Sequence, residues 1–115
     1  MYVPYKAWNV FLAKYPEETH EIVYADTRNE AKQKLIDGIS KTDGELAHDD
    51  SLEYIDLGAR RLKCCDGLSD EPLSLIAETA MKQDNWSWNM DGVDYTADDI
   101  ADPESLAEFK ALFDE

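Results

Sequence analysis

The chain has 115 residues, with 26 acidic and 11 basic side chains and a net charge of −15. At 43% hydrophobic residues it is too apolar for a disordered acidic tail, and its apolar runs are too short to cross a membrane. The negative charge disfavours direct binding to nucleic acid and to acidic membranes. A chain of this length is expected to form a single domain over residues 1–115. Because the N-terminus lacks the pattern of a signal peptide, we expect this domain to be cytoplasmic.

The N-terminal third of the chain contains the clearest local signals. Residues 8–14 and 20–25 are rich in aromatic and β-branched side chains, and the short polar segment between them contains a proline, which predicts a hairpin. Thr27 and Glu30 have the spacing of a capping box, in which each side chain bonds the backbone amide of the other residue. A helix is therefore predicted over about 28–39. Its apolar stripe consists of Ala31, Leu35, Ile36 and Ile39.

A third strand is predicted from about Tyr54 to Cys64. Ile55, Leu57 and Ala59 alternate with other residues and would share one face. The apolar residues that follow have the opposite parity, which is typical of a β-bulge, and we expect one near Gly58 and Ala59.

Cys64 and Cys65 are neighbours in this segment. A disulfide between adjacent residues closes a strained ring, so we expect two reduced thiols. On an extended strand one would point into the core and the other to the surface. The spacing does not fit half of a zinc site, and the only histidines are His20 and His48, so no metal centre and no cofactor are predicted.

The C-terminal half predicts a helix, a hairpin and a last helix. The first helix covers about 71–83, with apolar residues at core spacing. Asp91-Gly92 between two alternating runs indicates a tight hairpin over 86–96, and Asp102-Pro103 indicates the start of the last helix. One face of the hairpin could pack on the core or pair two subunits as a homodimer. That face consists of Trp86, Trp88 and Met90.

Taken together, the elements have the order ββαβαββα. This order predicts an α+β fold of two layers, an antiparallel sheet with helices packed on one face. Whether the hairpin 86–96 joins the main sheet is left open by the pattern.

The charge is unevenly distributed. Residues 1–41 contain six acids and six bases, whereas the remaining 74 residues contain 20 acids and five bases. Residues 84–115 alone contain ten acids and one base, and carboxylates spaced along a hairpin and a helix could imitate the charge of a nucleic-acid backbone. The alternative is that the charge serves only solubility. The candidate partner-binding residues are Asp91, Asp94, Asp98, Asp99, Asp102, Glu104 and Glu108.

The sequence gives weaker support to calcium binding, catalysis or phosphate binding. An EF-hand loop with Gly92 at its sixth position would begin at Ser87 and end at Asp98, which are the wrong ligands, in a strand where a helix should enter. No catalytic serine, phosphate-loop or dinucleotide motif occurs, so we expect a protein that is not an enzyme and has no catalytic residues. The basic cluster Arg60-Arg61-x-Lys63 could contact a phosphate, but pairing with nearby acids such as Asp56 and Asp66 is favoured.

The N-terminal segment resembles a family of small open reading frames of bacteriophages and prophages. The residues that carry the resemblance are Tyr24, Ala25, Thr27, Arg28, Ala31 and Lys32, followed by Arg60 and Arg61. Such families are mostly of unknown function, so no residue role is transferred. Phages encode many small acidic proteins that block host nucleic-acid enzymes, including restriction, recombination and CRISPR effectors.

The leading hypothesis is therefore a non-enzymatic interaction protein of the host cytoplasm. It would bind a basic protein surface, such as that of a host nucleic-acid-binding enzyme, through residues 84–115. The alternative is a small accessory or structural phage protein whose acidic face is only solvated. A third hypothesis is a cation-binding protein or a metal-dependent enzyme.

Overall fold

The chain folds into two compact units, Met1–Asp70 (unit 1) and Glu71–Glu115 (unit 2). The computed structural model describes residues 3–90 and 92–114. Helices and strands follow one another in the predicted order ββαβαββα, with short 3₁₀ turns between them, and the strands pair antiparallel. The predicted α+β class is confirmed. The single domain over residues 1–115 stays a prediction.

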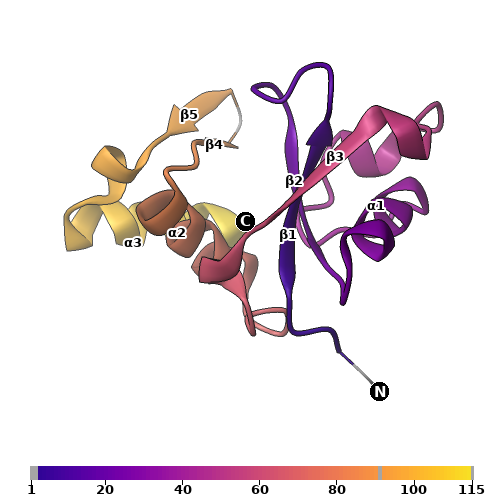
Figure 1. Cartoon of the computed structure of the whole chain (residues 1–115). Coiled ribbons are helices and arrows are strands. Elements are labelled where there is room, and N and C mark those ends of the chain that lie inside the picture. Colours follow the sequence, from indigo (N-terminus) through magenta and orange to yellow (C-terminus); the bar gives the residue numbers. More distant parts are fainter. Residues whose placement is uncertain (1–2, 91, 115) are drawn as a thin grey trace. The chain divides into compact units, whose positions relative to one another are not determined.

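Unit 1 is built around a three-stranded sheet in the order β2-β1-β3 (Figure 1). The strands are β1 (Ala7–Leu12), β2 (His20–Tyr24) and β3 (Leu57–Arg61), and helix α1 (Arg28–Ile36) packs on one face of this sheet. Removing the apolar side chains between helix and sheet from water is the main source of stability for this unit. These side chains are Trp8, Val10, Val23, Ala25, Ala31, Leu35, Leu46, Ala47 and Leu57.

Helix α1 begins where the sequence predicts and ends earlier. The Thr27 hydroxyl accepts a hydrogen bond from the Glu30 amide at 3.2 Å, as expected of an N-cap. The Glu30 carboxylate instead lies 3.3 Å from Lys34 Nζ, so the second bond of the predicted capping box gives way to an ion pair. Gly38 has φ +80°, a left-handed conformation that stops the helix, and leaves Ile39 55% exposed, outside the predicted stripe.

The third strand is shorter than predicted, because a 3₁₀ turn lies at each end of it. Tyr54–Asp56 and Lys63–Cys65 are 3₁₀ turns, and β3 pairs with β1 in continuous register without a bulge. The expectation that Ile55 shares the buried face of Leu57 is wrong, since Ile55 is 80% exposed. The cause is a capping box, in which the Asp56 carboxylate accepts a bond from the backbone amide of Glu53 and coils the chain before the strand begins.

Unit 2 consists of a two-stranded hairpin and two helices (Figure 1). Helix α2 spans Leu73–Asp84, and the hairpin pairs β4 (Trp88–Met90) with β5 (Val93–Tyr95) as a sheet of its own. Helix α3 spans Pro103–Ala111, as the aspartate-proline signal predicts. Asp91 lies outside the described residues. Gly92 has φ +86°, which agrees with the predicted tight turn.

The aromatic face of the hairpin packs within unit 2. Trp86, Trp88 and Met90 pack against a buried cluster that includes Phe109, which is 1% exposed. The Trp88 and Phe113 rings lie 6.2 Å apart, within the range of favourable aromatic pairs. Burial inside the chain therefore accounts for this face, and the homodimer stays a prediction. No helix among the described residues is long and apolar enough to cross a membrane.

Candidate functional site: the acidic surface of unit 2

Unit 2 contains 12 acidic and two basic side chains, and both bases bind the same carboxylate. Lys82 Nζ lies 3.2 Å from Glu78 Oε2, and Lys110 Nζ lies 2.6 Å from Glu78 Oε1. Burial raises the pKa of Glu78, but the hydrogen bonds from Lys110 and Lys82 outweigh burial and hold the pKa below its ordinary value. Within the described part of unit 2, the other carboxylates are left without a basic partner.

The hairpin positions the first of these carboxylates. Asp94 Oδ1 accepts a hydrogen bond from Asn89 Nδ2 at 3.0 Å, across the strand pair. Asn89 Oδ1 in turn accepts from the Gly92 amide at 3.2 Å. These bonds fix the hairpin and leave the Asp94 side chain at the surface.

The 3₁₀ turn Ala97–Ile100 positions the next pair. Asp99 Oδ2 accepts bonds from the Thr96 amide at 2.8 Å and from the Thr96 hydroxyl at 3.1 Å, which completes a capping box. Asp98 precedes it and is exposed, while Ile100 is buried and anchors the turn to the core. The two aspartates therefore differ: the Asp99 side chain holds the turn, and the Asp98 side chain makes no bond with the described part of the chain.

The N-terminus of α3 positions the last three. Asp102 is the N-cap and accepts a bond from the Ser105 amide at 3.1 Å, and the bonds to Ser105 hold its pKa below the ordinary value. Glu104 lies in the first turn, where the helix dipole favours an anion, and Glu108 lies one turn further on. Both glutamates are exposed.

The structure thus brings six of the seven predicted residues to the surface of one unit, and the seventh, Asp91, is not described. Three of the six hold local structure: Asp94, Asp99 and Asp102. The side chains of the other three make no hydrogen bond or ion pair with any described residue. These are Asp98, Glu104 and Glu108, and they are the best candidates for contact with a partner.

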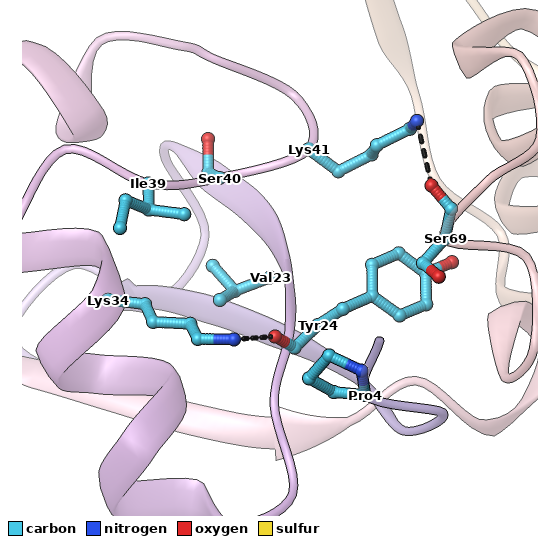
Figure 2. A pocket seen from close by; sticks show the side chains of 8 residues that line it. All are labelled: Pro4, Val23, Tyr24, Lys34, Ile39, Ser40, Lys41 and Ser69. Carbon is cyan, nitrogen blue, oxygen red and sulfur yellow. Dashed lines mark hydrogen bonds between the residues drawn. The ribbon is translucent and has the colours of Figure 1, made fainter. Parts of the chain in front are cut away.

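A shallow depression in unit 1 was not predicted from the sequence (Figure 2). Its volume is about 220 Å³, and both of its lysines are engaged by backbone oxygens: Lys34 Nζ donates to Tyr24 O at 2.8 Å, and Lys41 Nζ to Ser69 O at 3.0 Å. These bonds tie α1 and the loop after it to the rest of unit 1. The lining comes from segments far apart in the sequence, so no local motif could reveal it: Pro4, Val23, Tyr24, Lys34, Ile39, Ser40, Lys41 and Ser69.

Sequence reasoning also missed a buried carboxylate in unit 1. Glu21 on β2 is fully buried, and its carboxylate accepts bonds from two hydroxyls and three backbone amides of the loop after α1. Every partner donates, so the arrangement suits an ionised carboxylate, which only accepts. The donors are Ser40 Oγ, Thr42 Oγ1, and the amides of Gly44, Leu46 and Ala47. The role of Glu21 is to hold this loop in place.

Both arginines of the basic cluster lie on β3 and contact other residues of unit 1. Arg61 forms an ion pair with Asp66 and lies 5.5 Å from the ring of Trp8, which agrees with the expected pairing to a nearby acid. Arg60 lies 5.5 Å from the ring of Phe11. These contacts explain both arginines without a bound phosphate.

The described residues contain no group of three or more His, Cys, Asp or Glu side chains placed to hold a metal ion. The segment of the EF-hand alternative, residues 87–98, contains strands β4 and β5, which pair as a hairpin where an EF-hand would have its calcium loop. Comparisons with models of protein families, with curated proteins and with solved structures find no match for the chain.

Proposed function

We propose that the protein is a non-enzymatic interaction protein that binds a basic protein surface through unit 2. The observation that carries this proposal is the arrangement around Glu78, which takes up both lysines of the unit. Solubility alone does not require the two cations of the unit to share one half-buried carboxylate, and the ion pairs have a second effect besides stabilising α2 and α3. A surface that meets a basic partner gains from this sharing, because its exposed carboxylates are kept free for the partner.

The partner's chemistry follows from the charge. Closely spaced carboxylates on a compact unit offer a basic groove the negative field that it otherwise takes from nucleic acid. The partner class we propose is a host nucleic-acid-binding enzyme or defence effector, whose groove the protein would occupy. The resemblance of the N-terminal segment to phage and prophage proteins supports the same class, and with it a role in the host cytoplasm.

The experiment is a pull-down from host lysate with the full chain as bait, followed by competition with heparin. We expect a captured nucleic-acid-binding protein to be released by heparin and by high salt. Heparin is a polyanion that competes with the carboxylates for the basic surface, and salt screens the attraction between them. A capture that neither heparin nor salt disturbs would contradict a charge-based interface.

A variant pair tests the surface itself. The triple change Asp98→Asn, Glu104→Gln, Glu108→Gln removes three charges without removing a described bond. The matched control removes the same number of exposed charges from unit 1: Glu17→Gln, Glu18→Gln, Asp50→Asn. We expect the first triple to weaken binding at least tenfold and the control to retain most of it, and equal losses would place the partner elsewhere.

The runner-up is an accessory phage protein with a solvated acidic face. The structural tasks of Asp94, Asp99 and Asp102 favour it, because part of the acidity is explained by hairpin and helix caps. Under this hypothesis the two triple variants would behave alike in every binding assay. The third hypothesis, a cation-binding protein or a metal-dependent enzyme, requires that a divalent cation such as calcium raise the melting temperature.

A further inference from the structure

The two adjacent cysteines of unit 1 lie in a geometry that the sequence did not predict. They belong to the 3₁₀ turn Lys63–Cys65 rather than to an extended strand, and both are thiols. Their Sγ atoms lie 3.8 Å apart, with Cys65 buried and Cys64 half-buried. On a strand the two side chains would diverge to opposite faces, so the turn is what brings the sulfurs together.

The distance between the sulfurs matches a chelating pair. Two thiolates bound at about 2.3 Å to one tetrahedral ion lie roughly 3.8 Å apart, as follows from the tetrahedral angle. Thiolates are soft ligands that select soft cations over calcium or magnesium. We propose that Cys64 and Cys65 form a two-sulfur binding site for a soft, thiophilic divalent cation.

The turn is held in the conformation that the site needs. The Cys65 amide donates to Leu62 O at 3.0 Å, and the Cys65 carbonyl accepts from the Leu68 amide at 3.2 Å. The same carbonyl accepts from the Tyr24 hydroxyl at 2.7 Å. These bonds hold the backbone of the turn, and the bond from Tyr24 ties it to β2.

The site is bidentate, and of its two thiols only Cys64 is partly exposed. In the described part of the chain no third His, Cys, Asp or Glu completes a ligand group with the two thiols. The remaining positions of the ion would be taken by water or by an exogenous ligand, entering next to the half-buried Cys64. Binding converts two thiols and one divalent cation into two metal–sulfur bonds, and two protons go to solvent with no change of oxidation state.

The experiment titrates the full chain with Cd²⁺ under reducing conditions. We expect one ion per chain, with ultraviolet absorption from sulfur-to-cadmium charge transfer, which carboxylate binding cannot produce. Calcium in excess should leave this absorption unchanged. Absence of the absorption at one equivalent of Cd²⁺ would overturn the proposal.

Variants separate the thiols from the acidic surface. Cys64→Ser should lower the affinity at least about tenfold while the melting temperature stays close to that of the parent chain, because Cys64 is only half-buried. Cys65→Ser should do the same, provided circular dichroism shows a folded chain. The triple variant at Asp98, Glu104 and Glu108 should keep the absorption. Undiminished affinity in Cys64→Ser would overturn the assignment.

Discussion

Gly44 and the carboxylate of Glu21 lie so close together that no side chain fits between them. A Cβ atom on Gly44 would lie 2.6 Å from Glu21 Oε2 and 3.1 Å from Glu21 Cδ. The carboxylate cannot retreat cheaply, because five hydrogen bonds hold it. We predict that Gly44→Ala destabilises the protein by about 1–3 kcal/mol, measured by urea unfolding.

Gly92 provides the matched control for this prediction. Its φ is +86°, and nothing lies within 4 Å of the place where its Cβ would be. Asparagine tolerates the left-handed conformation, so Gly92→Asn should change the free energy of unfolding by no more than about 0.5 kcal/mol. Gly44→Asn should cost at least as much as Gly44→Ala. Equal effects of the two asparagine variants would contradict crowding at Gly44.

The second prediction concerns Glu21 itself. In Glu21→Gln the side chain keeps its size, but an amide NH₂ replaces one oxygen and faces backbone donors that then have no acceptor. Buried donors without acceptors are costly, so we expect a loss of roughly 2–4 kcal/mol in the free energy of unfolding. Hydrogen exchange should show the Leu46 and Ala47 amides losing protection before those of α1. Unchanged protection at both amides would refute the proposed role of Glu21.

The third prediction is a dependence on pH at the start of α3. Bonds to Ser105 lower the pKa of Asp102 below its ordinary value of 3.8, so the folded state favours the ionised form. The stabilisation is therefore fully present above pH 3.8 and is lost as pH falls through the folded-state pKa. The melting temperatures of the parent chain and of Asp102→Ala should differ above pH 3.8 and converge below it. Asp98→Ala, which removes no cap, should show no such convergence.

The fourth prediction separates the two lysines that bind Glu78. Lys82 and Glu78 both lie on α2, whereas Lys110 lies on α3 and joins the two helices. Double-mutant cycles with Glu78→Gln should give a coupling of about 0.3–0.5 kcal/mol for Lys82→Met and about 0.5–1 kcal/mol for Lys110→Met. Both couplings should shrink in high salt. A larger coupling for Lys82 than for Lys110 would contradict the prediction that the pair between the two helices contributes more to stability.

Features set by neighbouring residues could be predicted from the sequence. The first hairpin, the Thr27 cap, the Asp102-Pro103 helix start and the turn at Gly92 each depend on a few adjacent side chains, and the structure has all of them. The prediction for Ile55 was wrong for a related reason. The alternation of apolar residues predicted that the strand begins at Tyr54, whereas the capping box between Glu53 and Asp56 folds that segment into a 3₁₀ turn.

Features that join distant segments could not be predicted. The donors to Glu21 begin 19 residues further along the chain, and a lone glutamate on a strand carries no sign of them. The sharing of Glu78 between Lys82 and Lys110 depends on how α3 packs against α2. The acidic surface could be predicted because it rests on composition, and the sequence also indicated Asp102 at the start of α3, but it did not indicate the bonds of Asp94 and Asp99.

The arrangement around Glu78 also determines which cross-linking reagents and proteases can be used to study unit 2. Lys82 and Lys110 supply its only side-chain amines, and unit 2 contains no arginine. Amine-directed cross-linkers can therefore read unit 2 only at these two paired lysines and not at the carboxylates that we propose for the partner, and trypsin will leave residues 83–110 as one peptide. Carbodiimide coupling of carboxylates to a partner's lysines reads that surface directly, and its cross-links should appear at exposed carboxylates that hold no local structure, such as Glu104 and Glu108.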